Sequence, residues 1–380
     1  MSSISSSSPS SISSSSTLQL NHFVSKTGSN TSPYDTWAKA SNTIQAALNV
    51  ASSGDTVRIW AGTYVENITV GSGITLRSDT GSYSDVTIDG GNIERVVTMG
   101  SNSWLIGCTV TNGNRNYFYS TSDYGGGIYG GSASYCNITD NYALNAGGVG
   151  SCVLYNCRIT YNTAADAGGA RACTFYNCIV GNNTASDAGG GIIGCTLYNS
   201  LIYENTASNA QGGGGALSTF YNCTVVNNTT ATTGGGGWNC TFVNSISWDN
   251  NVADYFSGSW NNSYSCGVGY TGTNSITSDP LFDSPGNYHL KPASPCRDVG
   301  NNSGWAGLSD SLDLDGRPRI LPPEGIVDMG AYEYEDESSS NSSSNSSTSS
   351  LSSISSLSSQ SSLSSQSSLS SLSSISSFPL

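Results

Sequence analysis

A repeating unit of 21 to 23 residues fills the middle of the chain, between Cys136 and Ser245. Each unit contains the pattern Cys/Ser-x-Leu/Phe-Tyr/Val-Asn-Cys/Ser, a second Asn follows five residues later, and a Gly cluster opens the next unit. Fixed self-similarity at this length is typical of a solenoid, in which each repeat buries its apolar face only against its neighbours. The five patterned segments begin at Cys152, Cys173, Cys195, Ser218 and Cys240.

The residues within one unit alternate in a way that favours strands over helices. In the segment that begins at Cys173, we expect Phe175 to face inward and Thr174 and Tyr176 to face outward. Asn177 and the Gly residues are expected at the corners, because both tolerate the left-handed backbone of a sharp bend. Short strands of this kind, three per coil, predict an all-β parallel β-helix, whereas tandem helical repeats need longer units and less Gly.

Successive coils of a β-helix place equivalent residues about 4.8 Å apart, so that like residues stack on like. Asn residues at the corners are expected to hydrogen-bond along their own stack. Each buried apolar side chain contributes roughly 1.5 to 3 kcal/mol, so several coils fold where one alone would not. The predicted inward stacks are Cys152/Cys173/Cys195/Cys240, Leu154/Phe175/Leu197/Phe220/Phe242 and Cys136/Cys157/Cys178/Cys223.

The composition at the two ends of the chain excludes a packed core. Residues 1–16 and 337–380 are mostly Ser and indicate disordered linkers, of a kind that O-glycosylation would suit. Serine tracts at both ends suggest a module from a larger multidomain protein. Between them we assign a β-helix with an N-terminal cap to residues 17–277, and C-terminal coils with a cap to residues 278–336.

The charge balance limits the partners of the chain. Acidic residues outnumber basic ones by 26 to 12, for a net charge of −14, so neither nucleic acid nor an anionic membrane surface is an expected partner. No apolar run is long enough for a membrane span, and the N-terminus does not read as a signal peptide. The serine linkers and polar repeats favour an extracellular or cell-surface location, with any signal sequence upstream of this chain.

Most of the eleven cysteines fall on the predicted inward stacks, where Cys acts as a small buried apolar residue. Cys266 and Cys296 lie outside the regular coils, and we expect any disulfide to join these two. A zinc site is not expected, because the chain has two His and no CxxC pair.

A short amphipathic segment precedes the first coil. Residues 40–52 predict a helix, with Ser41 or Asn42 as its N-cap. A helix at this place would cover the open end of the core, as solenoids require.

Three parts of the chain resemble known families. Asp55-Thr56-Val57 and Gly62-Thr63-Tyr64-Val65-Glu66, after such a helix, resemble the start of right-handed parallel β-helix proteins of the pectate-lyase-like superfamily. The Gly-rich and Phe/Leu-Tyr-Asn pieces resemble the repeats of polymorphic outer-membrane proteins. Residues 278–334 resemble the C-terminal segment of secreted bacterial β-helix proteins called choice-of-anchor Q, in the stretches 279–282, 288–290, 294–300, 313–319 and 328–334. The resemblance implies a right-handed β-helix over about residues 23–335, and it leaves the function open among lyases, hydrolases and adhesins.

Four tyrosines occupy one predicted outward column, beside a column of Thr. Aromatic faces in a row can stack on sugar rings while their hydroxyls make polar contacts, so this column is the candidate ligand-binding site. The alternative is that the rings pair across strands and only stabilise the sheet. The column consists of Tyr155, Tyr176, Tyr198 and Tyr221.

Acidic residues supply the catalytic and metal candidates. Asp166 and Asp187 occupy equivalent places in adjacent coils, and two such carboxylates repel unless a cation or Arg lies between them. Ca²⁺ is therefore the one cofactor to consider, and these two residues are candidate metal ligands. With Arg158 and Arg171 they are also the catalytic candidates for a lyase or hydrolase. A solvated turn is the simpler interpretation.

Two further acidic groups are weaker candidates. Asp313 and Asp315, just before Gly316, are a second possible metal pair, against which a structural turn is again the simpler interpretation. Asp140, Glu204 and Asp249 share one repeat position but lie in non-adjacent coils, so no two of them make the carboxylate pair that a hydrolase needs.

We therefore predict a secreted or cell-surface β-helix module that binds a polysaccharide or cell-surface glycan, or acts as an adhesive spacer, without chemistry of its own. Two alternatives stay open. One is a polysaccharide lyase or glycoside hydrolase that acts on an anionic or plant-type glycan, and the other is a purely structural stalk.

Overall fold

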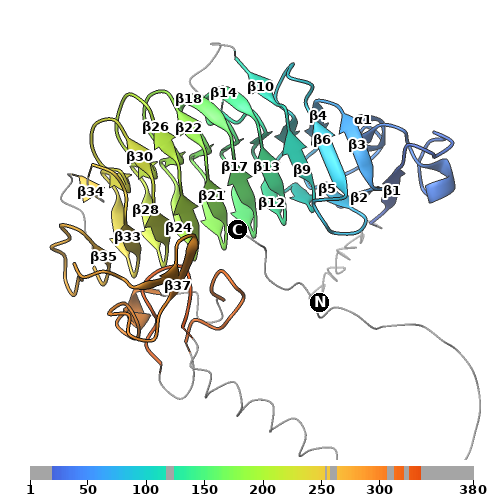
Figure 1. The fold of residues 1–380 in the computed structure, drawn as a ribbon. Helices are drawn as coiled ribbons and strands as arrows, with labels where there is room; N and C mark the ends of the chain where they lie inside the picture. The colour runs from blue at the N-terminus through green and yellow to red at the C-terminus, as the bar shows by residue number, and fades with distance from the viewer. Residues whose placement is uncertain are drawn as a thin grey trace, which may run out of the picture.

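The computed structural model describes residues 19–116, 124–252, 255–256, 263–305, 312–320 and 325–334. The serine tracts predicted as linkers, 1–16 and 337–380, lie outside these residues. The described residues form a right-handed parallel β-solenoid of about nine turns with almost no helix, which confirms the predicted fold class (Figure 1). None of the helices among them is long and apolar enough to cross a bilayer.

Each regular coil contributes four short strands rather than the three that the repeat predicted. The additional strand forms because the residues after the repeated Asn pair with their equivalents before the Gly cluster turns the chain again. One coil shows the order, with β16 (Val153–Tyr155) in sheet A, β17 (Arg158–Thr160) in sheet B, β18 (Thr163–Asp166) in sheet D and β19 (Ala170–Arg171) in sheet C.

Sheets A and B run the length of the solenoid with ten strands each. Sheet A consists, in spatial order, of β1 (Asn21–Val24), β2 (Thr56–Ile59), β5 (Thr75–Ser78), β8 (Trp104–Ile106), β12 (Ser132–Ser134), β16, β20 (Thr174–Tyr176), β24 (Thr196–Tyr198), β28 (Thr219–Tyr221) and β32 (Thr241–Val243). Sheet B consists of β3 (Gly62–Val65), β6 (Val86–Asp89), β9 (Thr109–Thr111), β13 (Asn137–Thr139), β17, β21 (Ile179–Gly181), β25 (Leu201–Tyr203), β29 (Thr224–Val226), β33 (Ile246–Trp248) and β35 (Cys266–Gly267).

Two smaller sheets close the coil. Sheet C consists of β4 (Ile68–Val70), β7 (Val97–Met99), β11 (Ile128–Tyr129), β15 (Val149–Gly150), β19, β23 (Ile192–Ile193), β27 (Gly215–Ala216), β31 (Gly237–Trp238) and β34 (Tyr255–Phe256). Sheet D consists of β10 (Asn114–Arg115), β14 (Tyr142–Asn145), β18, β22 (Thr184–Ala185), β26 (Thr206–Ala207) and β30 (Thr229–Thr230). The described helices are η1 (Trp37–Lys39), α1 (Ile44–Leu48) and η2 (Asn302–Trp305).

The predicted inward stacks form the core. Leu154, Phe175 and Leu197 are Cα partners on successive strands of sheet A and are fully buried. The stack ends on paired aromatic rings, because Phe220 and Phe242 have ring centroids 4.7 Å apart. The Cys stacks are buried too, as predicted.

The cysteine thiols form hydrogen bonds with backbone groups at the coil corners, as well as filling space in the core. The Cys178 thiol donates to the Tyr176 carbonyl at 3.3 Å and accepts the Cys157 backbone N–H at 3.4 Å. Ser200 does the same one coil later, with its hydroxyl donating to the Tyr198 carbonyl at 2.8 Å. Cys and Ser can replace each other in this stack because both can donate to one carbonyl and accept one amide.

No disulfide joins any of the eleven cysteines, all of which are buried, so the expected pairing of Cys266 with Cys296 is wrong. Both thiols lie in one buried cluster with Ile246, Leu290 and Met329, where they pack as apolar side chains.

A ladder of buried Asn side chains joins sheet B to sheet D. Asn183 shows the pattern: its amide group donates to Asn205 Oδ1 at 2.9 Å and to the Ile159 carbonyl at 2.8 Å. The ladder residues satisfy buried amides and carbonyls at the corner, as expected of Asn. The left-handed backbone belongs to the residue before each of them, such as Asn182 with φ 55°. The ladder comprises Asn141, Asn162, Asn183, Asn205, Asn228 and Asn250.

Gly is needed at this corner because the backbones of neighbouring coils approach each other closely there, as well as for its tolerance of positive φ. In one coil the positive φ belongs to Ala167, at 57°, rather than to the following Gly168. A Cβ on Gly168 would lie 2.4 Å from the Gly190 carbonyl oxygen in the next coil, so a side chain there would push neighbouring coils apart.

The N-terminal helix is shorter than predicted and is capped differently. Helix α1 begins at Ile44, and Thr43 is its N-cap residue without a side-chain bond, so Ser41 and Asn42 do not cap it. Its first amides instead donate to the Glu66 carboxylate, at 2.8 Å from Ile44 and 3.0 Å from Gln45. A carboxylate at a helix N-terminus satisfies these amides and opposes the helix dipole. The helix buries Ile44, Ala47 and Leu48 in the core.

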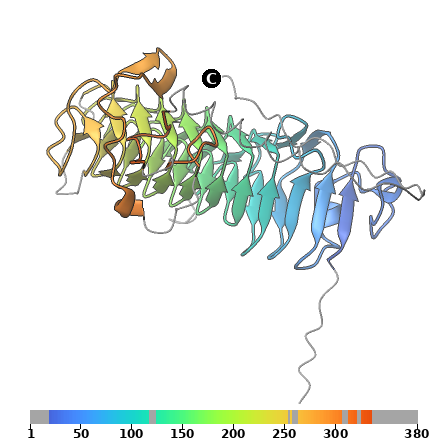
Figure 2. The same ribbon diagram turned by 90° about the horizontal axis from the view of Figure 1, so that it is seen from below.

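The described residues of the segment 278–334 do not continue the coils but lie across the outside of sheet B. The hairpin of β36 (Phe282–Ser284) and β37 (Asn287–Leu290) is antiparallel and separate from the four solenoid sheets. Figures 1 and 2 show this orange segment against the last, yellow-green coils. Tyr288 and Tyr332 pack there on Leu201 and Val226, which point outward from sheet B.

Candidate functional site

The four tyrosines predicted as a ligand-binding column lie side by side on the outer face of sheet A. Tyr155, Tyr176, Tyr198 and Tyr221 are Cα partners on strands that pair in register. Successive ring centroids are 5.0 Å apart, and successive rings are within 9° of parallel. The structure therefore brings all four residues together.

This stacking turns the ring faces toward one another. A sugar ring stacks on an aromatic face, but inside the column that face already lies against the next ring. Partial burial raises the pKa of Tyr155 and Tyr198, and a neighbouring Tyr176 phenolate would raise each pKa further. The column therefore presents a ridge of ring edges and uncharged phenol hydroxyls, one per coil.

The register of this column continues toward the N-terminus with different chemistry. Arg58, Arg77, Ile106 and Ser134 precede Tyr155 in turn. Ser134 lies on β12, between the strands of Trp104 and Tyr155, and its small side chain leaves room for the Trp104 ring to reach Tyr155. The two ring centroids are 5.7 Å apart and the ring planes make an angle of 27°. Arg58 Nε donates to Asp79 at 2.8 Å, whereas Arg77 Nε donates to the Ser78 carbonyl at 3.3 Å.

The predicted acidic corner is only partly assembled. Asp166 ends β18, and its carboxylate accepts the Ala188 N–H at 3.4 Å. Asp187 is exposed at the equivalent place in the next coil. Among the described residues, no group of three or more His, Cys, Asp or Glu is arranged to hold a metal ion.

The two arginines proposed for that corner lie on different sheets. Arg171, on β19 of sheet C, lies 5.2 Å from the ring centroid of Tyr124 and donates to Asn145 at 3.5 Å. Arg158, on β17, belongs to sheet B. A site that used both arginines with Asp166 and Asp187 is therefore not assembled here.

Asp313 and Asp315 form a turn within the C-terminal segment. The Asp313 carboxylate accepts three backbone N–H groups, from Asp315 at 3.0 Å, Arg317 at 2.7 Å and Glu333 at 2.9 Å. Burial raises the pKa of Asp313. The His289 ring lies 2.6 Å from Asp315 and lowers the pKa of that carboxyl. Both carboxylates are therefore engaged by protein groups.

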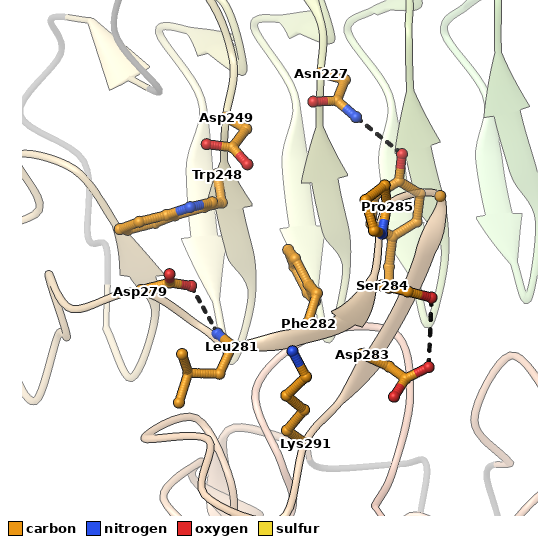
Figure 3. Close-up of a pocket in the computed structure, with 12 residues that line it drawn as sticks. Asn227, Trp248, Asp249, Asp279, Leu281, Phe282, Asp283, Ser284, Pro285 and Lys291 are labelled. Carbon is orange, nitrogen blue, oxygen red and sulfur yellow. Dashed lines mark hydrogen bonds between the residues drawn. The ribbon is translucent and has the colours of Figure 1, made fainter.

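A pocket of about 440 Å³ opens between the last coils of sheet B and the hairpin (Figure 3). Trp248, from β33, and Phe282, from β36, supply its aromatic walls. Tyr288 ties the hairpin to the coils, because its hydroxyl accepts a hydrogen bond from Asn227 Nδ2 at 3.0 Å. The Tyr288 ring also meets Phe282 edge to face, with centroids 5.5 Å apart.

Three acidic residues and one basic residue border this pocket: Asp249, Asp279, Asp283 and Lys291. One oxygen of Asp279 accepts the Leu281 N–H at 2.8 Å, and one oxygen of Asp283 accepts Asn287 Nδ2 at 3.0 Å. Within the described part of the chain, Asp249 and Lys291 form neither a hydrogen bond nor an ion pair through their side chains. Figure 3 shows the Lys291 ammonium next to Phe282.

Sequence reasoning missed this pocket, although the repeat contained a signal for it. From β21 onward, outward positions of sheet B carry apolar side chains where a solvated face would be polar. A covering segment is the physical reason for such residues. They are Ile179, Leu201, Tyr203, Val226, Ile246 and Trp248, and they pack against residues 278–334.

Comparison with known proteins bears on the fold. No family profile matches the sequence, and neither does any curated protein. The crystal structure of pectate lyase Pel9A is similar with a TM-score of 0.50 and 15% identity, over 83% of this chain and 97% of that one. A pectin methylesterase from Aspergillus niger shares 15% identity over 71% of this chain and 86% of its own, at a TM-score of 0.33, too low to support a conclusion. At these identities the likeness concerns the fold alone, and the chain has a parallel β-helix fold of the pectate-lyase-like kind.

Proposed function

We propose that this chain is a secreted or cell-surface β-helix module that binds a polysaccharide along the outer face of sheet A, without chemistry of its own. The observation that carries the proposal is the column of four tyrosines at a 5.0 Å repeat. A phenol hydroxyl both donates and accepts a hydrogen bond. A regular row of such groups suits a polymer whose own hydroxyls recur regularly along its length.

The surroundings of the column support an elongated contact. The neighbouring outward column consists of Thr174, Thr196, Thr219 and Thr241, whose hydroxyls add a second polar row. Ten strands at about 4.8 Å make sheet A roughly 45 Å long. Trp104 is half-buried at the N-terminal end of the column. Of the four tyrosines, its ring stacks only on Tyr155.

Two further observations are consistent with a glycan partner and a surface location. The similar fold described above belongs to a pectate lyase, an enzyme named for a polysaccharide. The sequence resemblance to polymorphic outer-membrane repeats and to choice-of-anchor Q segments supports display at the cell surface, within a larger protein.

A lyase or hydrolase has less support. Such an enzyme needs acid, base and charge-stabilising groups in one cleft. Asp166 and Asp187 adjoin a corner where Arg171 is directed toward Tyr124 and Asn145, and Arg158 lies on another sheet. A calcium ion between the two carboxylates would be required, and a calcium-dependent assay tests that idea directly.

The test compares hydroxyl removal with ring removal. The full chain and two double variants, Tyr176→Phe/Tyr198→Phe and Tyr176→Ser/Tyr198→Ser, would be assayed for retention on a panel of polysaccharides. We expect the Phe variant to keep the stacked rings and to lose roughly 5- to 150-fold in affinity, since two hydrogen bonds at roughly 0.5–1.5 kcal/mol each are removed. Tyr161→Phe, an exposed tyrosine at a corner, is the control and should bind normally.

Three other outcomes would each support a different function for the chain. Unchanged binding by both double variants, with only the Ser variant losing stability, would mean that the column merely stabilises the sheet. New reducing or unsaturated chain ends, especially if they require calcium, would make the protein an enzyme. Retention on no polysaccharide would leave a structural stalk.

A further inference from the structure

We propose that the pocket between sheet B and the hairpin β36–β37 is a second binding site, separate from the tyrosine column, and that it takes one uncharged sugar unit. The tyrosine column lies on sheet A, whereas this pocket is built on sheet B and the C-terminal segment. The two sites therefore share no residue.

The aromatic walls suit the apolar side of a sugar. Trp248 reaches the pocket from the coils and Phe282 from the hairpin, so the two rings come from opposite parts of the structure (Figure 3). Unlike the rings of the tyrosine column, Trp248 takes part in no described ring stack with another side chain. An aromatic face available in a pocket can pack against the C–H face of a pyranose.

The polar groups suit hydroxyls on the other side of the same ligand. Asp249 has both carboxylate oxygens available among the described residues, and Asp279 has one besides the oxygen that accepts the Leu281 N–H. Carboxylates accept hydrogen bonds from hydroxyls, and the Lys291 ammonium donates to an ether or hydroxyl oxygen. A sugar supplies donors and acceptors in one small ring, which matches this mixture.

The charge of the pocket selects against anionic sugars. Three carboxylates and one ammonium border it, a sum of −2, within a chain of net charge −14. A uronate would bring a fourth carboxylate close to the other three, and its repulsion would exceed the attraction of one Lys. An uncharged sugar avoids this repulsion.

Hydrogen bonds hold the hairpin in place, so that the pocket is preorganised for a ligand. The Ser294 hydroxyl donates to the Pro280 carbonyl at 2.6 Å, and the Lys291 N–H donates to the Leu281 carbonyl at 3.0 Å. Together with the Asn227–Tyr288 bond, these contacts fix Phe282 opposite Trp248 before any ligand binds. A prepared site avoids the entropic cost of ordering side chains on binding.

The experiment titrates the full chain with short neutral oligosaccharides of glucose, xylose, mannose, galactose and arabinose, and with trigalacturonate. Binding would be followed by tryptophan fluorescence and calorimetry at low and high NaCl. We expect at least one neutral oligosaccharide to bind with an affinity that salt leaves unchanged, because no ion pair forms. Trigalacturonate should bind at least about tenfold more weakly, because its carboxylates are repelled by those of the pocket.

Asp249→Asn is the decisive variant. Asn182 and Asn227 occupy the same left-handed corner in other coils, so the substitution preserves the backbone while it removes the charge. We expect about tenfold weaker binding, because a hydrogen bond to a charged acceptor is replaced by a neutral one. Asp140→Asn makes the same change at the equivalent corner of a distant coil and should bind like the parent.

The results separate this site from the tyrosine column. Tyr176→Phe/Tyr198→Phe should leave oligosaccharide binding unchanged, and Asp249→Asn should leave polysaccharide retention on sheet A unchanged. The pocket proposal is overturned if no neutral oligosaccharide binds, if trigalacturonate binds more tightly than every neutral sugar, or if Asp249→Asn and Asp140→Asn behave alike.

Discussion

At the scale of single residues, this fold depends on polar side chains that satisfy buried backbone groups at the corners. Asn183 receives the Asn162 N–H at 3.0 Å on its side-chain oxygen and donates to the Ile159 carbonyl. Each ladder Asn therefore forms hydrogen bonds with backbone groups of the preceding coil, so that these buried groups are paired where the chain turns. A residue at these positions must therefore be buried and form hydrogen bonds, because each buried amide left unpaired costs about 1–3 kcal/mol.

We predict that Asn183→Ala lowers the free energy of unfolding by about 3 kcal/mol, because it leaves the Asn162 amide and the Ile159 carbonyl unpaired at about 1–3 kcal/mol each. Chemical denaturation monitored by circular dichroism measures this change. The neighbouring Asn182→Gly is the matched control and should change stability by less than about 0.5 kcal/mol, since Gly accepts the left-handed backbone. Equal effects of the two substitutions would contradict a special role for the ladder.

The Cys stacks make a second prediction at this scale. Cys178→Ser should cost less than about 1 kcal/mol, because Ser200 makes the same two bonds in the next coil. Cys178→Val, similar in size but unable to bond, should cost about 1–3 kcal/mol more. A purely apolar role for the thiol would reverse this order, and thermal unfolding of both variants decides between them.

At the scale of elements, the C-terminal segment is the part that builds a site on the solenoid. Its fold centres on Arg319, which is fully buried and donates to the Gly330 carbonyl at 2.7 Å. Arg319 Nε lies 3.2 Å from Glu333 Oε1. Asp328 accepts the Asp298 and Tyr334 amides, each at 2.7 Å. A short segment with few apolar residues is thus held in one conformation by hydrogen bonds to buried ionisable side chains.

We predict that Arg319→Met loosens this segment while the coils stay folded. At a pH above about 8, where Glu333 is ionised, removing the cation leaves this carboxylate and its neighbours uncompensated, which typically costs 3–5 kcal/mol, as an order of magnitude. Limited proteolysis should cut the 278–334 segment faster, and the neutral oligosaccharide should bind more weakly because Phe282 is no longer fixed. The double variant Arg319→Met/Glu333→Gln should recover part of the loss. No recovery would show that charge pairing is not what holds the segment.

At the scale of the whole molecule, the same cluster gives stability a dependence on pH. Burial raises the pKa of Glu333 from 4.5 to about 8 and that of Asp328 from 3.8 to about 6. A carboxyl whose pKa is higher in the folded state stabilises the fold fully below its ordinary pKa. That contribution is lost as the pH rises through the folded value.

We therefore predict that the docked segment becomes less stable as the pH rises from about 5 to about 8, by an amount on the order of a few kcal/mol. Hydrogen exchange of residues 278–334 across this range measures the effect. Glu333→Gln should flatten the profile, whereas Glu204→Gln, an exposed carboxyl on a corner, should leave it unchanged. Stability that increases with pH would contradict the assignment.

The sequence by itself determined the solenoid, its inward stacks and the membership of the tyrosine column, because a period of one coil places like residues at the spacing of paired strands. The tertiary structure alone decided how those residues are oriented. Tyr176 stacks face to face with its neighbours, Asp166 and Arg158 lie on different sheets, and no disulfide joins Cys266 to Cys296. The Trp248–Phe282 pocket joins positions far apart in the chain, and a local repeat contains no information about which distant segment covers which face.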